Sequence, residues 1–161
     1  MAVEITNVRV DNLPALRFIG KRCMCGPEGF VAQWGEWFEN GWFVQLEKMG
    51  VAPENGDAAL GVTQYDRYWI GLLFPADTPV PEGFAHMELP ASRYAVFGLA
   101  GREPGALFGE EGAMLCCGEM EKRGWIPREG GWGVERYSIS PALSGKKVNV
   151  LYEFLNSIEG E

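Results

Sequence analysis

Leu89-Pro90-Ala91-Ser92-Arg93-Tyr94 resembles Leu13-Pro14-Ala15-Leu16-Arg17-Phe18, with an offset of 76 residues between positions 13 and 89. A second pair of similar segments is Gly61-Val62-Thr63-Gln64-Tyr65 and Gly133-Val134-Glu135-Arg136-Tyr137, with an offset of 72 residues between positions 61 and 133. Each match alone is weak. Two matches at nearly one offset favour an internal duplication over chance.

Both pairs of segments fall at the same place in a predicted order of strand, strand, helix, strand, strand. Alternating apolar residues predict the strands, with a bulge near Asn7 and a turn at Asp11-Asn12 that makes the first two strands a hairpin. Apolar residues at helical spacing begin at Phe30 and are interrupted at Asn40-Gly41, where the helix should end or bend. Strands are expected over about 3–10, 13–20, 60–65, 68–74, 84–89, 94–99, 133–137 and 148–155, with a hairpin at 90–92 and a second helix over about 104–123.

The sequence therefore predicts an α+β fold made by tandem duplication of one unit with this order of elements. Two such units would pair through antiparallel sheets about a pseudo-two-fold axis, with a ligand cleft between the halves. We expect one domain over 1–161, with repeat one at about 1–75 and repeat two at about 84–161. The linker at about 75–83 carries three prolines, which disfavour both a helix and a central strand.

Composition limits the function. The chain has 161 residues, 47% of them hydrophobic, and a net charge of −8 with a pI near 4.8. A nucleic-acid partner would call for a basic face, so direct nucleic-acid binding is not expected. No apolar run reaches the roughly 18–20 residues that cross a bilayer, and no basic segment precedes an apolar block at the start. We expect a cytoplasmic protein.

The four cysteines, Cys23, Cys25, Cys116 and Cys117, do not have the spacing of a zinc site, and His86 is the only histidine. We interpret them as reduced thiols that pack as small apolar residues. No metal and no cofactor are expected.

Glu135 is the candidate functional residue. In a strand over 133–137 its side chain lies on the same face as Tyr137 and Ile139, which places a carboxylate on the apolar side. A buried charge needs a partner, and the first copy carries Thr63 at this position, so the architecture does not require the carboxylate. We therefore hypothesise that Glu135 anchors an aromatic small-molecule pocket. The alternative is a surface ion pair with Lys146 or Lys147.

The chain resembles the GyrI-like small-molecule-binding domain, which is the effector-binding domain of AraC- and MerR-type transcription regulators, over nearly its full length and without a DNA-binding part. The segments that carry the resemblance are Phe18-Ile19-Gly20, a tryptophan-bearing first helix, Tyr68-Trp69-Ile70-Gly71, Pro81-Glu82-Gly83-Phe84, Leu89 to Phe97, Gly124-Trp125 and Glu135-Arg136-Tyr137. The last strand departs from the family, because it reads Tyr152-Glu153-Phe154-Leu155 where an Ile-Pro pair is common.

The resemblance implies an α+β fold made by tandem duplication of a strand-helix-strand-strand unit. Its pocket would hold cationic, lipophilic or aromatic compounds, with the family's glutamate at Glu135. Rings around the carboxylate would bury the flat body of a ligand and offer π-faces to its charge. The residues expected to bind the ligand are Glu135, Tyr137, Trp69, Trp34, Phe38 and Tyr152.

We expect a stand-alone binding protein, acting as a sensor or a sequestering module, rather than an enzyme, and we assign no catalytic residue. One alternative is a hydrolase of small molecules in which Glu135 is the general base and Tyr137, or a nearby tyrosine, the proton donor. A second alternative is an interaction module that resembles gyrase inhibitors, and a protein partner or a homodimer is compatible with the sequence.

Overall fold

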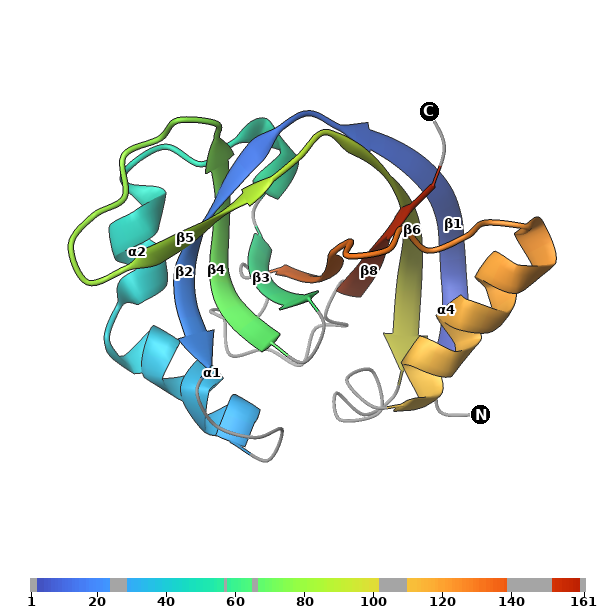
Figure 1. Cartoon of the computed structure of the whole chain (residues 1–161). Coiled ribbons are helices and arrows are strands. Elements are labelled where there is room, and N and C mark those ends of the chain that lie inside the picture. The colour runs from blue at the N-terminus through green and yellow to red at the C-terminus, as the bar shows by residue number, and fades with distance from the viewer. Residues whose placement is uncertain are drawn as a thin grey trace.

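The computed structural model describes residues 3–23, 29–56, 58–64, 67–101, 110–138 and 152–159. Its strands form one antiparallel sheet, and helices pack against it, so the predicted α+β class is confirmed (Figure 1). The elements are β1 (Val3–Leu13), β2 (Leu16–Cys23), α1 (Phe30–Glu39), α2 (Trp42–Glu47), the 3-10 helix η2 (Pro53–Asn55), β3 (Ala58–Gln64), β4 (Arg67–Pro75), β5 (Ala85–Leu89), β6 (Ser92–Gly101), α4 (Glu110–Arg123), β7 (Gly133–Ser138) and β8 (Tyr152–Ile158).

The order of strands in the sheet is β1-β6-β8-β7-β3-β4-β2-β5. Exchanging β1 with β5, β2 with β6, β3 with β7 and β4 with β8 turns this order into its own reverse. The centre of the pattern is the β3–β7 pair, one strand from each half of the chain. A duplicated unit would produce this arrangement, although the duplication itself stays a prediction.

The two predicted hairpins at the repeated Leu-Pro-Ala segments are wrong. β1 pairs with β6, and β2 pairs with β4 and β5, while residues 11–12 lie inside β1. A proline holds the residue before it in extended backbone, so the chain runs on past Pro14 and Pro90 instead of reversing. Tight hairpin turns use residues with positive φ, and none is found at 11–15 or 89–92.

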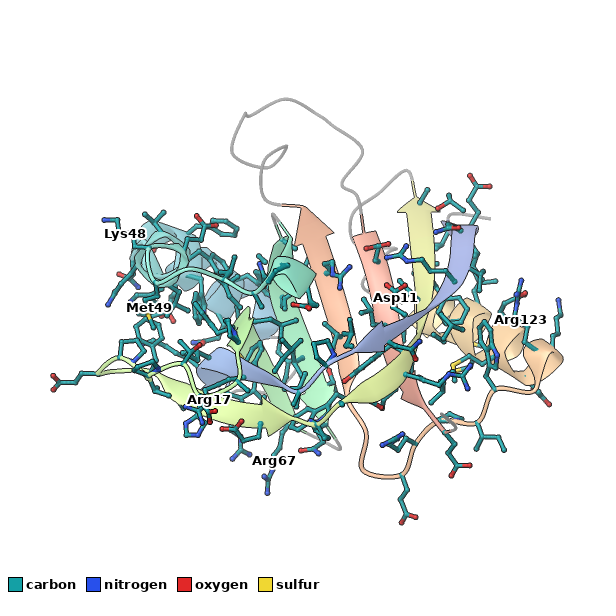
Figure 2. All side chains as sticks on the ribbon, turned by 90° about the horizontal axis from the view of Figure 1, so that it is seen from above. Asp11, Arg17, Lys48, Met49, Arg67 and Arg123 are labelled. Atoms are coloured by element: carbon teal, nitrogen blue, oxygen red, sulfur yellow. The ribbon has the colours of Figure 1, made fainter. Side chains whose placement is uncertain are left out.

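Two long ribbons result, β1–β2 and β5–β6, which run antiparallel to one another. Leu13 pairs with Ser92 and Leu16 with Leu89, so the same register continues across both proline segments. Figure 1 shows the ribbons arching across the molecule, and Figure 2 shows them from above as they pass over the central strands. The ribbons therefore join the two halves of the chain.

Several local predictions are confirmed. The register of β1 shifts between Ile5 and Asn7, as the predicted bulge requires. The first helix ends at Glu39, and Gly41, with φ of 67°, separates it from α2. Residues 102–109 and 139–151 lie outside the described part, so the expected starts of the second helix and of the last strand are not described, although β8 continues to Ile158.

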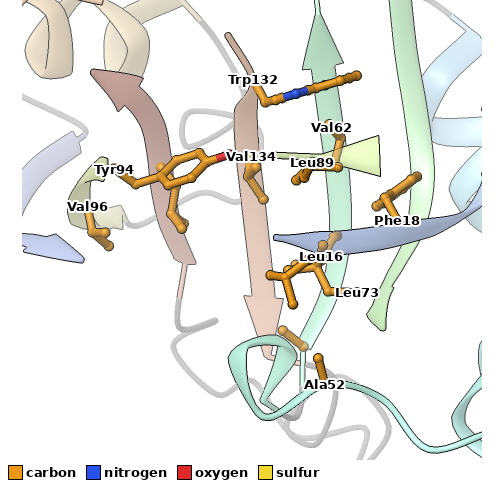
Figure 3. Packing of buried hydrophobic residues seen from close by; sticks show 13 residues of the cluster. Leu16, Phe18, Ala52, Val62, Leu73, Leu89, Tyr94, Val96, Trp132 and Val134 are labelled. Atoms are coloured by element: carbon orange, nitrogen blue, oxygen red, sulfur yellow. The ribbon is translucent and has the colours of Figure 1, made fainter. Parts of the chain in front are cut away.

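The two faces of the sheet are covered differently. One face carries a buried cluster made by the strands and their connections, without residues of α1, α2 or α4 (Figure 3). Its members include Leu16, Phe18, Leu60, Val62, Leu73, Tyr94, Val96, Trp132, Val134 and Leu155. We call this face the ribbon face, because residues of both ribbons pack there.

The opposite face carries the helices, and we call it the helix face. Trp37, Phe43 and Leu46 of α1 and α2 pack against β2, β3 and β4, while Cys116 and Met120 of α4 pack in a separate cluster with β1 and β6. The central β3–β7 pair lies between these two clusters in the sheet. In the part of the chain that is described, no helix is long and apolar enough to cross a membrane.

Candidate functional site

Glu135 lies in β7, at the centre of the sheet. It pairs with Gly61 of β3 on one side and with Phe154 of β8 on the other. Alternation along β7 directs Val134 into the cluster of the ribbon face, so Glu135 and Tyr137 take the helix face. Glu135 keeps partial contact with solvent, although protein atoms surround most of its carboxyl group.

Three aromatic side chains cluster with the Glu135 carboxyl group, namely Tyr137 of β7, Tyr68 of β4 and Trp34 of α1. The Tyr137 hydroxyl group donates a hydrogen bond to Glu135 Oε2, and the side chain of Tyr68 is also hydrogen-bonded to Glu135. Trp34 Nε1 donates to the Tyr68 hydroxyl oxygen over 3.0 Å. The Trp34 ring meets the Tyr137 ring edge-on, with 5.2 Å between centroids and 88° between planes. We call these four residues the Glu135 cluster.

Ordinary local structure places each member of the cluster. Tyr68 pairs with Thr63 of β3, so Gly61, two residues before Thr63, is its diagonal neighbour on the same face. Trp34 lies one helical turn before Trp37, which is buried against the sheet, so both side chains point from α1 towards the helix face.

Burial dominates the electrostatics of Glu135. It raises the pKa of the carboxyl group from 4.5 to about 7, while the hydrogen bonds from Tyr137 and Tyr68 oppose this rise. The neighbouring Arg136 faces the ribbon face, where its Nη1 is 3.0 Å from Glu153 Oε1. Lys146 and Lys147, the alternative partners considered above, lie outside the described residues.

The predicted site residues divide into two groups. Glu135, Tyr137 and Trp34 lie together in the Glu135 cluster. Trp69 pairs with Val62 and packs on the ribbon face, away from Glu135. Phe38 is 46% exposed, and its ring centroid is 5.3 Å from that of Phe43. Tyr152 pairs with Tyr137 through the backbone, and its side chain is outside the described part.

Tyr68 is the member of the cluster that the sequence interpretation missed. A signal for it was present. A tight β3–β4 hairpin pairs residue 63 with either 68 or 70, and in both registers the side chain of residue 68 shares a face with that of residue 63. Since Thr63 aligns with Glu135 when the two similar segments are compared, Tyr68 was a stronger candidate than Trp69.

No protein family model matches the chain, and no curated protein matches it. Solved structures do. SAV2435 bound to tetraphenylphosphonium is similar with a TM-score of 0.73 and 14% identity, over 96% of this chain and 95% of that one. A bacterial transcription regulation protein from Staphylococcus aureus MU50 gives a TM-score of 0.68 and 13% identity, over 96% and 99%. The chain has the fold of a GyrI-like effector-binding domain.

A third similar structure is that of EcmrR, in a complex with DNA. It has a TM-score of 0.68 and 13% identity to this chain, which matches over 96% of its own length but covers 58% of EcmrR. The resemblance inferred from the sequence is thus confirmed at the level of fold. At these identities the similarity does not transfer a ligand or a role.

The raised pKa of Glu135 predicts how Glu135→Gln changes stability with pH. The folded protein holds the Glu135 proton up to about pH 7, whereas the unfolded chain releases it near 4.5, so ionisation weakens the folded state as pH rises through this window. Glu135→Gln removes that cost. In urea unfolding at pH 8 we expect the variant to exceed the wild type by about 2–3 kcal/mol, and at pH 4 to equal it. Equal stability at pH 8 would contradict the assigned burial.

Proposed function

We propose that the chain binds a cationic small molecule with an aromatic or lipophilic body at the Glu135 cluster. The observation that carries the proposal is a carboxyl group at the centre of the sheet, partly open to solvent, whose described hydrogen-bond partners are tyrosine hydroxyl groups. A bound cation would favour the ionised form of Glu135, which burial disfavours in the free protein. The free energy lost by ionising the empty site would then be recovered on binding.

The rings of the cluster suit such a ligand. Tyr68, Tyr137 and Trp34 provide apolar area and π-faces, and a well-placed cation–π contact stabilises a complex by about 0.5–2 kcal/mol. The carboxyl group already receives hydrogen bonds from both tyrosines, so the ligand needs to supply charge rather than N–H donors. We therefore expect quaternary or delocalised cations to bind better than primary ammonium ions of similar size.

The similarity to SAV2435 supports this ligand class. That protein shares the fold over almost the full length of both chains, and its structure contains tetraphenylphosphonium, a lipophilic aromatic cation. Tetraphenylphosphonium is therefore a suitable first probe, with triphenylphosphine oxide as a neutral analogue of related shape.

Titration of tryptophan fluorescence tests the proposal. Glu135→Gln should weaken tetraphenylphosphonium binding at pH 8 about tenfold or more, which corresponds to about 1.4 kcal/mol, because the charge partner is lost while the rings stay. Affinity for triphenylphosphine oxide should be unchanged. The control is Glu121→Gln, which removes the charge of an exposed carboxylate on α4.

Equal affinity of the wild type and Glu135→Gln for the cation would overturn the proposal. So would a preference of the wild type for the neutral analogue. A loss of affinity in Glu121→Gln as large as in Glu135→Gln would indicate that net charge acts at long range rather than through the site.

A second candidate function is hydrolysis of an electrophilic small molecule. The observation that favours it is a carboxyl group with a pKa of about 7 hydrogen-bonded to Tyr137, since a general base works best when its pKa is near the working pH. Glu135 would take a proton from water as the water oxygen attacks the electrophilic carbon. The Tyr137 hydroxyl group would protonate the leaving oxygen.

Turnover of an aryl epoxide, followed by product analysis, tests this second function. The rate should rise as pH passes through about 7, where Glu135 becomes ionised, and Glu135→Gln should abolish it. Tyr137→Phe should lower the rate about 10²-fold or more, because the proton donor is lost. A rate no higher than that of buffer alone would leave binding as the function.

A further inference from the structure

The backbone conformation at position 61 does not require a glycine. Gly61 lies in β3 between Leu60 and Val62, both fully buried, and its φ is not in the left-handed region where glycine is favoured. A glycine inside a strand weakens it and is often found where another group comes close. What favours a glycine at position 61 is therefore the space that a side chain would fill.

The end of the Tyr68 ring occupies that space. A Cβ atom at position 61 would lie 2.9 Å from the Tyr68 ζ carbon and 3.2 Å from its ε1 carbon, and closer still to the hydroxyl oxygen. Real Cβ atoms essentially never come so near, so Tyr68 would have to move. Tyr68 is itself buried and receives the hydrogen bond from Trp34, which limits where it can go.

Directly opposite Gly61 in the sheet is Glu135. The Tyr68 ring comes from β4, crosses over β3 at the glycine and brings its hydroxyl group to the carboxyl group of β7. Without room at Gly61, this path across β3 is closed. The glycine thus lies under the hydroxyl group that completes the pair of tyrosine donors on Glu135.

We propose that Gly61 is a positioning residue for Glu135. Its missing side chain leaves the slot through which Tyr68 reaches the carboxyl group, so that two tyrosines hold the carboxyl group instead of Tyr137 alone. The consequence for ligand binding rests on the proposed function above, because a carboxylate that loses one donor is ionised less readily at neutral pH.

Gly133 provides a matched control within the chain. It occupies the corresponding place in the second repeated segment, lies two residues before Glu135 and has no positive φ. A Cβ atom there would meet the Phe154 ζ carbon at 3.7 Å, which is ordinary van der Waals contact. Gly133→Ala therefore adds the same methyl group near the same carboxyl group without displacing a tyrosine.

Titration of the Glu135 carboxyl group in the ligand-free protein tests the proposal. With ¹³C-labelled glutamate, its signal is assigned by its loss in Glu135→Gln. Gly61→Ala and Tyr68→Phe should each move the midpoint upward by about one unit, a tenfold change in proton affinity, because a donor to the ionised form is removed. The double variant should show no further shift, and Gly133→Ala should titrate like the wild type.

Either of two titration patterns would overturn the proposal. In the first, the Glu135 carboxyl group of Gly61→Ala titrates with the wild-type midpoint, while that of Tyr68→Phe is shifted. In the second, the midpoint shifts by the same amount in Gly133→Ala as in Gly61→Ala. Should Gly61→Ala be too unstable to titrate, adding Tyr68→Phe removes the atom that clashes most, so the double variant should unfold at a higher urea concentration than Gly61→Ala alone. Absence of this rescue would also overturn it.

Binding of tetraphenylphosphonium to the same variants separates this inference from the proposed function. At pH 7 Gly61→Ala should bind the cation more weakly than Gly133→Ala, and the difference should shrink at pH 9, where the carboxyl group is ionised in both. If the carboxyl titrations shift as expected but the wild type binds no cation, the proposed function fails and the role of Gly61 stands. If the wild type binds the cation but the titrations do not shift, the proposed function stands and the role of Gly61 fails.

Discussion

The buried, ionisable carboxyl group of Glu135 is the constraint on which the site depends. A carboxylate at the centre of a sheet is unfavourable unless other groups stabilise its charge, and here the described stabilising groups are the hydroxyl groups of Tyr68 and Tyr137. They do not offset burial completely, so the pKa remains near 7. Glu135 thus lowers the stability of the folded protein at neutral pH. Residues that are retained for function commonly carry such a cost in stability.

The crossing of the two ribbons gives this carboxyl group its central place. Because Pro14 and Pro90 keep the chain extended, β1 and β5 each pair with a strand of the opposite half, and β3 and β7 are left to pair at the middle of the sheet. The two Leu-Pro-Ala segments that stand out in the sequence lie against one another at this crossing. The two Leu-Pro-Ala segments therefore shape the fold by pairing strands of one half of the chain with strands of the other.

The sequence predicted what depends on neighbours along the chain. Alternation identified β7 and placed Glu135 beside Tyr137, and helical spacing located Trp34 and the break at Asn40-Gly41. Strand pairing was less accessible, because it depends on contacts between residues far apart in the chain. The hairpins were wrong for this reason, Trp69 was expected near Glu135 although it packs on the other face, and Tyr68 was missed.

The most direct test of the central claim is the number of protons released when a cation binds. Titration calorimetry with tetraphenylphosphonium at pH 7, in two buffers of different ionisation enthalpy, measures this number. With a pKa of about 7 in the free protein, binding should release about half a proton per ligand in the wild type and none in Glu135→Gln. Heats that are the same in both buffers for the wild type would contradict the account.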